Sequence, residues 1–512
     1  MDLVLNKFKN FKYKSSFYAG IIAGLLAHMF VIVNRLPNSD SMTNFYFDQN
    51  MVTSGRWFLG VACGISSFYD LPWLNGILAI LFLAVAATVV CAFFEVESKT
   101  LKLLIPAIMA VFPAVASTMT YLYTADGYML AFAAAMLAAY ISKVNKKWGF
   151  IAGGVLLAFS MGCYQAYLAG TILLCLFSIT LMVLNGDKIK DIWSRGWRFL
   201  AMGSIGAVLY YVLLKICLIA QGKELDTYQG INTMGKVGLS DIPVRVIGAY
   251  KDFASFALKG NTLTHDRFSC VLMVLLIVAA FVSMIHIYVK SKAIKKWYNT
   301  VFLALIGVLV PVASNVIMLM SAEIENHLLM RFHWSLFLVF MVVLLEKGLR
   351  GYKNKSWKIT YAIAVVIAFI VSYQYLVVDN IAYFNLHERY EKTYAYCVRL
   401  LDRMEQTEGY YAGIPVAMVG VISPEQYPST DITTKVTDHM IGARGDFLLY
   451  KPVMYTEYFR NVLGVEMNFV DEATVTEIYY TDEYVALQSF PKKDCMKVVD
   501  GILYVKLENE NR

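Results

Sequence analysis

Two apolar stretches constrain the fold of this chain more than any other feature of its sequence. Residues 103–140 contain one charged side chain, Asp126, and residues 149–184 contain none. A single helix over 103–140 would measure about 57 Å, nearly twice the roughly 30 Å of a bilayer hydrocarbon core. Each stretch must therefore fold as a helical hairpin inside a membrane. We expect the first hairpin to turn at 124–127 and the second near 162–165.

The composition is that of an integral membrane protein. Of the 512 residues, 58% are hydrophobic and 16% are charged, whereas soluble domains are about 25% charged. The mean hydropathy of +0.55 excludes an ordinary soluble enzyme, a disordered chain and a disulfide scaffold. The sequence predicts a polytopic α-helical membrane protein with about eleven transmembrane helices, near 16–34, 73–94, 103–122, 127–142, 148–163, 166–184, 197–219, 269–289, 299–320, 332–346 and 358–379.

Positively charged residues are concentrated in every second loop. Four lysines precede the first apolar run, and no small-residue cleavage motif follows that run, so we expect no cleavable signal peptide. The positive-inside rule places the N-terminus in the cytoplasm. It places the loops 35–72 and 220–268, and the tail from about 380, on the outer face of the cell membrane. Cytoplasmic loops account for the net charge of +7, so no nucleic-acid partner is predicted.

The polar tail reads as a small extracytoplasmic α/β domain over 381–512, following a multi-span transmembrane domain over 1–380. Residues 386–406 have helical periodicity, 415–421 read as a buried strand, 455–463 as a second helix, and 498–507 alternate like a strand. Cys397 and Cys495 both lie in this tail, so a disulfide between them is one alternative. Most of the eight cysteines are predicted to be buried small apolar side chains.

The 35–72 loop concentrates carboxylates, an arginine and aromatic residues directly after the first span. Asp40 and Asp48 are candidate bases for a hydroxyl, and Arg56 is a candidate partner for a phosphate. The stretch 57–68 is too short to span and is predicted to lie flat in the membrane interface. The alternative is a solvated loop with a structural contact between aspartate and arginine.

Two further candidates lie at the predicted hairpin breaks. Asp126 is expected at a hairpin tip facing water, a partner or a cavity, because a carboxylate at the bilayer centre costs about 2.5–3.5 kcal/mol. Tyr164 and Gln165 are candidate substrate-binding residues at the second break. The alternatives are a plain loop aspartate and an ordinary interfacial tyrosine.

The stretch 321–334 groups five ionisable side chains at the start of a span. On an α-helix His327 and Arg331 would share one face, where they would form a cationic clamp for a phosphate. The alternative is an arginine that snorkels beside an interfacial histidine. No P-loop, HExxH or DxD triplet and no cysteine–histidine spacing is found, so no metal site and no cofactor are predicted.

Several short motifs, taken in order, resemble those of the Gtr-type (GtrII-like) membrane glucosyltransferases. They are the lysines before one span, Ser39-Asp40, Gly55-Arg56-Trp57, Asp126 with Tyr-Gln-Ala-Tyr at 164–167, and a tail with Tyr390-Glu-Lys-Thr-Tyr-Ala-Tyr, Arg403-Met-Glu and Pro415-Val-Ala. The resemblance implies a GT-C architecture, an outward-facing site and a polyprenyl-phosphate-linked sugar as donor. It also implies a base on the first outer loop, with Asp40 as the best match and Asp48 second. Ser41 stands where some relatives carry a paired carboxylate, which leaves the base and any divalent-metal requirement open.

The resulting hypothesis is transfer of glucose, or a similar hexose, from this donor to a cell-surface glycan. Asp40 would act as base and Asp126 would position a substrate, while Arg56, His327 and Arg331 would contact phosphate. Two alternatives are a lipid-linked sugar flippase or other transporter, and a non-catalytic polysaccharide assembly factor. A transporter would show polar residues near mid-bilayer and internal symmetry, and apart from Lys215 few ionisable groups are expected inside the spans.

Overall fold

The computed structural model describes residues 11–43, 45–233, 238, 240–259, 267–320, 326–349, 355–421, 437, 439–445 and 448–508. The chain forms two compact units. The transmembrane unit comprises Met1–Asn34, Asp48–Asn380 and His439–Ile441, and the C-terminal unit comprises Arg35–Phe47, Ile381–Asp438 and Gly442–Arg512. The first part of the predicted 35–72 outer loop therefore belongs to the C-terminal unit.

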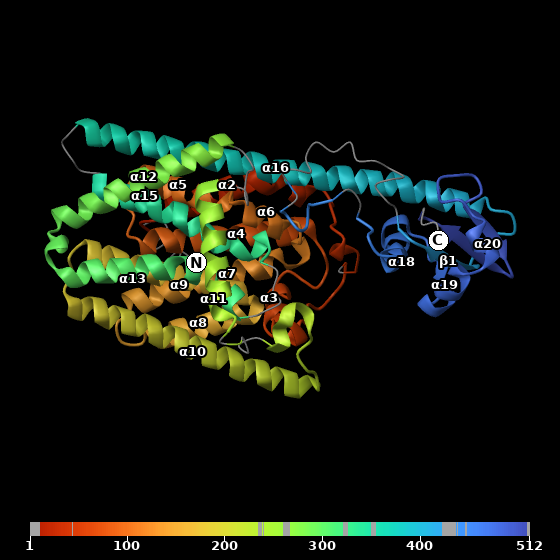
Figure 1. Cartoon of the computed structure of the whole chain (residues 1–512), viewed down its shortest axis with the longest axis horizontal. Coiled ribbons are helices and arrows are strands. Elements are labelled where there is room, and N and C mark those ends of the chain that lie inside the picture. The colour runs from red at the N-terminus through yellow and green to blue at the C-terminus, as the bar shows by residue number, and fades with distance from the viewer. Residues whose placement is uncertain are drawn as a thin grey trace, which may run out of the picture. The chain divides into compact units, whose positions relative to one another are not determined.

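The transmembrane unit is helical (Figure 1). Its main helices are α2 (Lys14–Val33), α4 (Pro72–Phe93), α5 (Lys99–Ala110), α6 (Pro113–Met119), α7 (Leu122–Val144), α8 (Gly149–Cys163), α9 (Leu168–Leu184), α10 (Ile189–Gln221), α11 (Ile242–Ala254), α12 (Arg267–Lys290), α13 (Trp297–Ser314), α14 (Val316–Met320), α15 (Ser335–Leu349) and the first half of α16 (Lys355–Glu405). Shorter elements are η2 (Val52–Ser54), α3 (Leu59–Cys63), η3 (Gln165–Tyr167), η4 (Tyr228–Thr233), the π-helix η5 (Ser255–Lys259), η6 (Ala293–Lys295) and η7 (Leu328–Trp334).

Within the described ranges, nine helices are long and apolar enough to cross a membrane. They confirm a polytopic helical membrane protein. The predicted span 103–122 is a helix pair, α5 and α6, bent by 47°, and Pro113 at the first position of α6 is suited to starting a helix after such a break. The predicted span 148–163 is the 15-residue α8, which at about 22 Å is shorter than the hydrocarbon core.

Both predicted hairpins are present, but the first turns earlier than expected. Helix α6 ends at Met119 and α7 begins at Leu122, so Asp126 lies inside the first turns of α7 and not at a loop tip. The prediction that 124–127 forms the turn was wrong because Thr120 and Tyr121 make it instead. The second break was predicted correctly, since α8 ends at Cys163 and α9 begins after the short η3.

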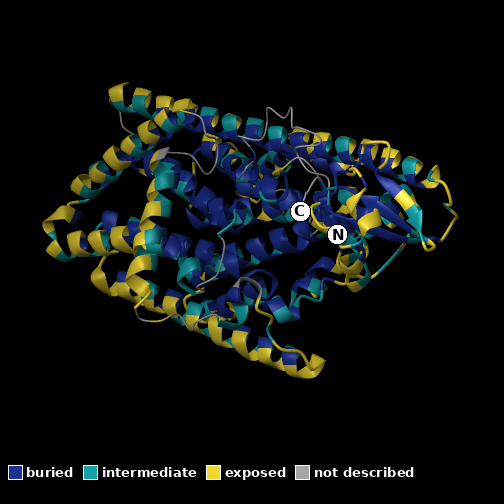
Figure 2. Cartoon of the chain, turned by 45° about the vertical axis from the view of Figure 1, so that its right-hand side comes forward, coloured by how far each residue is buried: buried dark blue, intermediate teal, exposed yellow. Residues whose placement is uncertain are grey.

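Burial distinguishes inner from outer helices of the transmembrane unit (Figure 2). In the most apolar window of the span Leu328–Gly348, 83% of residues are buried, against 28% in α10 and in α13. The outer helices expose large apolar side chains, among them Ile219, Phe281 and Trp297. Such a surface is incompatible with water over a large area and fits contact with lipid.

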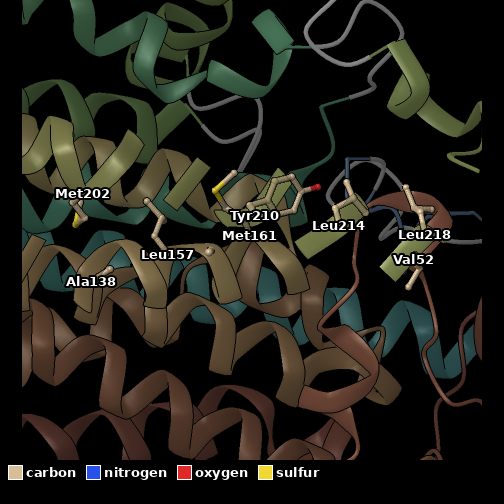
Figure 3. Packing of buried hydrophobic residues seen from close by; sticks show 9 residues of the cluster. Val52, Ala138, Leu157, Met161, Met202, Tyr210, Leu214 and Leu218 are labelled. Carbon is tan, nitrogen blue, oxygen red and sulfur yellow. The ribbon is translucent and has the colours of Figure 1, made fainter. Parts of the chain in front are cut away.

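One buried cluster joins α7, α8, α10 and η2 (Figure 3). Its members are Val52, Ala138, Leu157, Ala158, Met161, Met202, Tyr210, Leu214 and Leu218. Glycines bring these helices close together, because a Cβ on Gly153 of α8 would lie 2.7 Å from the Ala138 carbonyl oxygen of α7. The cluster thereby fixes η2, and the residues that follow it, against the ends of α8 and α10.

The C-terminal unit is a small α/β structure. Besides η1 (Asp40–Thr43) and the second half of α16, it contains β1 (Pro415–Val419), α18 (Val453–Tyr458), the π-helix η8 (Phe459–Leu463), β2 (Asn468–Phe469), α19 (Glu472–Tyr479), α20 (Asp482–Val485), β3 (Met496–Val499) and β4 (Ile502–Lys506). The sheet order is β2-β1-β4-β3, with β1 parallel to both neighbours. A central parallel strand is buried on both faces, which explains the apolar run Pro415–Val419.

Two predictions for the tail need correction. Residues 498–507 are not one strand but parts of β3 and β4, which pair antiparallel. Asp500 and Gly501 connect them with φ angles of 48° and 78°, as expected for a two-residue hairpin turn of this composition. Cys397 and Cys495 are free thiols, so the disulfide alternative is not realised.

The close approach of α7 and α8 can be tested with a glycine pair. Gly153→Ala should lower the melting temperature of the detergent-solubilised protein, because overpacking costs about 1–3 kcal/mol and outweighs the higher helix propensity of alanine. Gly203 of α10 has no atom within 4 Å of the equivalent Cβ position. Gly203→Ala should therefore leave the melting temperature unchanged or raise it, because alanine stabilises a helix by about 1 kcal/mol at most relative to glycine. Equal effects of the two substitutions would contradict the packing described here.

Candidate active site

A tight turn after η2 presents Arg56. The Arg56 amide donates to the Met51 carbonyl oxygen (3.0 Å), and Gly55 has a φ of 77°. A Cβ on Gly55 would lie 2.5 Å from Gln165 Nε2 and 2.7 Å from the Tyr210 hydroxyl oxygen. Glycine is thus required both by the left-handed backbone and by the lack of space.

The turn is held by hydrogen bonds from two other elements. Gln165 Nε2 donates to the Ser54 carbonyl oxygen (3.1 Å) and lies 3.0 Å from the Tyr210 hydroxyl oxygen. The Tyr210 hydroxyl donates to the Gly55 carbonyl oxygen (3.0 Å). These bonds are buried, so Gln165, a predicted substrate-binding residue, holds the backbone that carries Arg56.

The Arg56 guanidinium lies against a pair of tyrosines. Its Nη1 donates to the Tyr128 hydroxyl (3.0 Å), and its Cζ is 5.0 Å from the centre of the Tyr164 ring. The rings of Tyr128 and Tyr164 stack at 4.7 Å. A cation over an aromatic ring gains about 0.5–2 kcal/mol without losing its charge. The arrangement therefore fixes the position of a half-buried guanidinium.

Asp126 is almost fully buried, with 1% of its surface exposed. Its Oδ1 accepts from the Gly127 amide (2.9 Å), whereas Oδ2 has no hydrogen-bond partner among the described residues. Ser66 lies close by, but its hydroxyl donates to the Cys63 carbonyl oxygen (3.0 Å). A buried carboxylate oxygen without a hydrogen-bond donor lowers the stability of the fold. Asp126 therefore remains a candidate for contact with a ligand.

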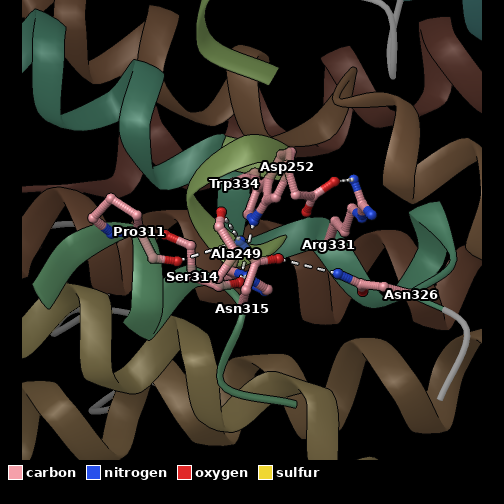
Figure 4. A network of polar contacts seen from close by, with 9 residues as sticks. Ala249, Asp252, Pro311, Ser314, Asn315, Asn326, Arg331 and Trp334 are labelled. Atoms are coloured by element: carbon pink, nitrogen blue, oxygen red, sulfur yellow. Dashed lines mark hydrogen bonds and ion pairs between the residues drawn. The ribbon is translucent and has the colours of Figure 1, made fainter. Parts of the chain in front are cut away.

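Arg331 forms an ion pair that was not predicted from the sequence (Figure 4). Its Nη1 lies 2.9 Å from Asp252 Oδ1 of α11, and 11% and 18% of the two side chains are exposed. Its guanidinium is 4.7 Å from the centre of the Trp334 ring. Burial raises the pKa of Asp252, and the Arg331 charge partly counteracts this. The Arg331 charge is therefore largely neutralised before any ligand binds.

The predicted helical face shared by His327 and Arg331 does not form. The described part of the stretch, 326–334, contains the 3₁₀ helix η7, preceded by His327 and kinked at Arg331, whose φ is −103°; residues 321–325 lie outside the described residues. His333 Nε2 and Trp334 Nε1 instead bond the Ser314 carbonyl oxygen, at 2.7 and 3.3 Å. A 3₁₀ helix aligns residues three apart and not four, so the geometry expected of a clamp is lost.

The neighbouring Asn315 and Asn326 complete this network (Figure 4). Asn315 Nδ2 donates to the carbonyl oxygens of Ala249 (3.2 Å) and Pro311 (3.3 Å). Asn326 Nδ2 donates to Asn315 Oδ1 (3.1 Å). The network ties α11 to the end of α13 and to η7, so its geometry is that of a structural support.

The two candidate bases lie in different units. Asp40 begins η1 of the C-terminal unit, where Asn38 Oδ1 accepts from the Ser41 amide (2.9 Å) and Asn461 Nδ2 donates to the Met42 carbonyl oxygen (2.9 Å). Asp40 keeps contact with solvent, yet partial burial raises its pKa, while the charge of Lys451 acts in the opposite direction. Asp48 is exposed in the transmembrane unit and accepts from the Asn50 amide (2.9 Å).

The structure thus brings together Arg56, Tyr164 and Gln165, with Asp126 two residues from Tyr128 on α7. Sequence reasoning missed Tyr128, Tyr210 and Asp252. Tyr128 follows Asp126 by two residues, and this closeness in sequence was the one available signal for it. The sequence does not indicate which of its many tyrosines contacts Arg56. In the part of the chain that the structure describes, no three histidine, cysteine or acidic side chains are grouped as metal ligands.

Comparison with protein families gives one match, and it covers more than half of the chain. The model of the family described as "Glucosyl transferase GtrII" matches residues 29–345. The matched range includes Asp40, Arg56, Asp126, Tyr164 and Arg331, and it ends before α16 and most of the C-terminal unit. Comparison with curated proteins gives no match. The chain belongs to the GtrII family of glucosyl transferases.

Proposed function

We propose that the protein transfers glucose, or a similar hexose, from a polyprenyl-phosphate-linked donor to a cell-surface glycan on the outer face of the membrane. The observation that carries the proposal is Arg56, a cation held by the Tyr128 hydroxyl and the Tyr164 ring at one end of the helices α7 and α8. The distribution of lysine and arginine supports an outward position of this end. A lipid-linked donor stays in the bilayer, so an enzyme that uses it needs its phosphate contact on a membrane-embedded element.

The proposed chemistry divides into two tasks. As the glycosidic bond to the donor phosphate breaks, negative charge grows on the leaving group and needs a nearby cation. Arg56 supplies that cation in our proposal, since the Tyr128 hydroxyl and the Tyr164 ring hold its guanidinium in place. Arg331 is paired with Asp252 and serves to hold η7 and α11 in place.

The acceptor hydroxyl needs a base. Asp40 takes this role in our proposal, because partial burial raises its pKa and a higher pKa makes a carboxylate a better proton acceptor. Asp126 positions a substrate through the Oδ2 atom that no described residue satisfies. No step of this scheme requires a metal ion.

Replacing the base should stop the reaction without affecting the fold. Asp40→Asn keeps the shape of the side chain but cannot accept the proton, and kcat should fall by about 10²–10⁴-fold. Asp48→Asn should retain most of the activity, because Asp48 is exposed and its carboxylate accepts from the Asn50 amide of its own loop. Transfer is measured with purified protein, a polyprenyl-phosphate glucose donor and a surface-glycan acceptor, with melting temperature as a check on folding. Full activity of Asp40→Asn together with loss in Asp48→Asn would move the base to Asp48.

The Arg56 contact should appear in the Michaelis constant for the donor and in the rate. Arg56→Gln removes the charge, so we expect kcat/KM for the donor to fall by about 100-fold or more. Tyr128→Phe keeps the ring and removes only the hydrogen bond to Arg56, so its effect should be less than about tenfold. A donor kcat/KM that is unchanged in Arg56→Gln would exclude Arg56 from phosphate binding.

The pH dependence should identify the partner of Asp40. A base is active when deprotonated, so activity is lost as pH falls through the pKa of Asp40, and a raised pKa places this loss at a higher pH. Lys451 lowers that pKa. Lys451→Met should therefore move the acidic limb of kcat/KM to higher pH, by less than about one unit, while the exposed Lys492→Met should leave it in place. A shift to lower pH in Lys451→Met would contradict the assignment.

A further inference from the structure

The C-terminal unit contains a pocket of about 680 Å³. It lies where the parallel strands β1, β2 and β4 end, between α18 and α19, which flank β1 in Figure 1. Ligands of open α/β sheets bind outside the carboxyl ends of parallel strands, and pockets of about 300–1,000 Å³ accommodate small ligands. The position and the volume of the pocket therefore both fit a binding site.

The strand ends shape one side of the pocket. Gly420, directly after β1, has a φ of 89°, and a Cβ there would collide with the side chain of Glu508 beyond the end of β4. Glu508 Oε1 accepts from the Val421 amide (3.2 Å). The glycine thus allows a carboxylate to lie at the strand ends, in the wall of the pocket.

Helix α19 supplies the opposite side. Glu472, Val475, Thr476 and Tyr479 line the pocket, at the spacing of three and four residues that places side chains on one helix face. The N-terminus of α19 is capped by Asp471, whose carboxylate accepts from the Thr474 amide (2.8 Å). The polar groups that this wall contributes to the pocket include the side chains of Glu472, Thr476 and Tyr479.

The chemistry of the walls favours a sugar over a phosphate. Aromatic rings of Phe469, Tyr479 and Tyr480 offer faces on which the C–H side of a hexose ring can pack. Carboxylates and threonine hydroxyls accept and donate hydrogen bonds to sugar hydroxyls. The charged side chains that line the pocket are Glu472, Glu508 and Lys451, an excess of negative charge that repels a phosphate.

Lys451 connects this pocket with the candidate base. It lies in the wall of the pocket and is close enough to Asp40 to lower the pKa of that carboxyl. Helix α18, which follows Lys451, packs against η1, and Asn461 holds the Met42 carbonyl oxygen (2.9 Å). The C-terminal unit therefore contains both a pocket suited to a sugar and, on the element next to it, the proposed base.

We infer that this pocket binds a saccharide segment of the acceptor glycan and so presents its hydroxyl for glucosyl transfer. The inference deepens the proposed function. The identification of the bound saccharide as the acceptor rests on that function, whereas the binding of a saccharide does not. The inference assigns a substrate-binding role to pocket residues between Val416 and Glu508, which lie outside the range matched by the family.

The proposal is tested by introducing a large side chain into the pocket at an exposed position of α19. Thr476 and Ala473 are both exposed on α19, but only Thr476 lines the pocket. Full-chain protein in detergent is applied to an array of immobilised neutral and amino-sugar oligosaccharides. Thr476→Trp should weaken binding of the recognised saccharide by about tenfold or more and raise the KM for acceptor to the same extent. Ala473→Trp should change neither value, and the donor KM should stay constant in both variants.

A milder substitution and a folding control complete the experiment. Glu472→Gln removes a charge at an exposed position and should weaken binding by about two- to tenfold, with unchanged melting temperature. If the wild type binds a saccharide and Thr476→Trp does not, but neither protein transfers glucose, the pocket would be upheld and the proposed function overturned. Equal binding by wild type and Thr476→Trp, or absence of binding to every saccharide on the array, would overturn the pocket while leaving glucosyl transfer intact.

Discussion

The transmembrane unit depends on the cost of leaving a polar group unpaired in an apolar interior. Several of its buried polar side chains avoid that cost by bonding to backbone atoms of another segment. His28 of α2 bonds the Ala110 carbonyl oxygen, Arg198 of α10 donates to that of Ser142, and Glu346 of α15 accepts from the amides of Glu97 and Ser98. These bonds join segments far apart in sequence, so they position helices as well as satisfy side chains.

Other buried polar atoms among the described residues make no such bond. Asp126 Oδ2, the Tyr167 hydroxyl and both carboxylate oxygens of Asp379 are buried and without a hydrogen-bond partner among the described residues. Tyr167 packs its ring against Tyr164 and Phe132, close to the tyrosine that contacts Arg56. Asp126 precedes Tyr128 by two residues on α7, and Tyr167 packs on Tyr164, so these two unsatisfied groups are neighbours in sequence or in space of the tyrosines that contact Arg56. A ligand that supplied the missing partners would remove the cost of leaving them unsatisfied.

The sequence predicted what depends on local composition and missed what depends on tertiary contacts. Hairpins were predictable, because a run such as 149–184 cannot cross a bilayer once, and the strand Pro415–Val419 was visible in its apolar pattern. The position of Asp126 was not, since whether a turn falls at 120 or at 124 depends on how α6 and α7 pack. The pairing of Arg331 with Asp252 joins residues 79 positions apart, which no local pattern encodes. The same holds for segment 35–47, which sequence order assigns to the membrane domain and packing assigns to the C-terminal unit.

The contrast between Arg56 and Arg331 shows how the environment of a residue decides its function. Both were equally good phosphate contacts on the basis of sequence, and both are partly or largely buried beside aromatic rings. A carboxylate at 2.9 Å neutralises Arg331, and separating such a buried pair to bind a phosphate would leave Asp252 as an uncompensated charge, at a cost of about 3–5 kcal/mol. Arg56 donates to the Tyr128 hydroxyl and lies over the Tyr164 ring, and both contacts stabilise a cation. An anion that approaches Arg56 need break neither of these two contacts, which is why our proposal gives the phosphate contact to Arg56 and not to Arg331.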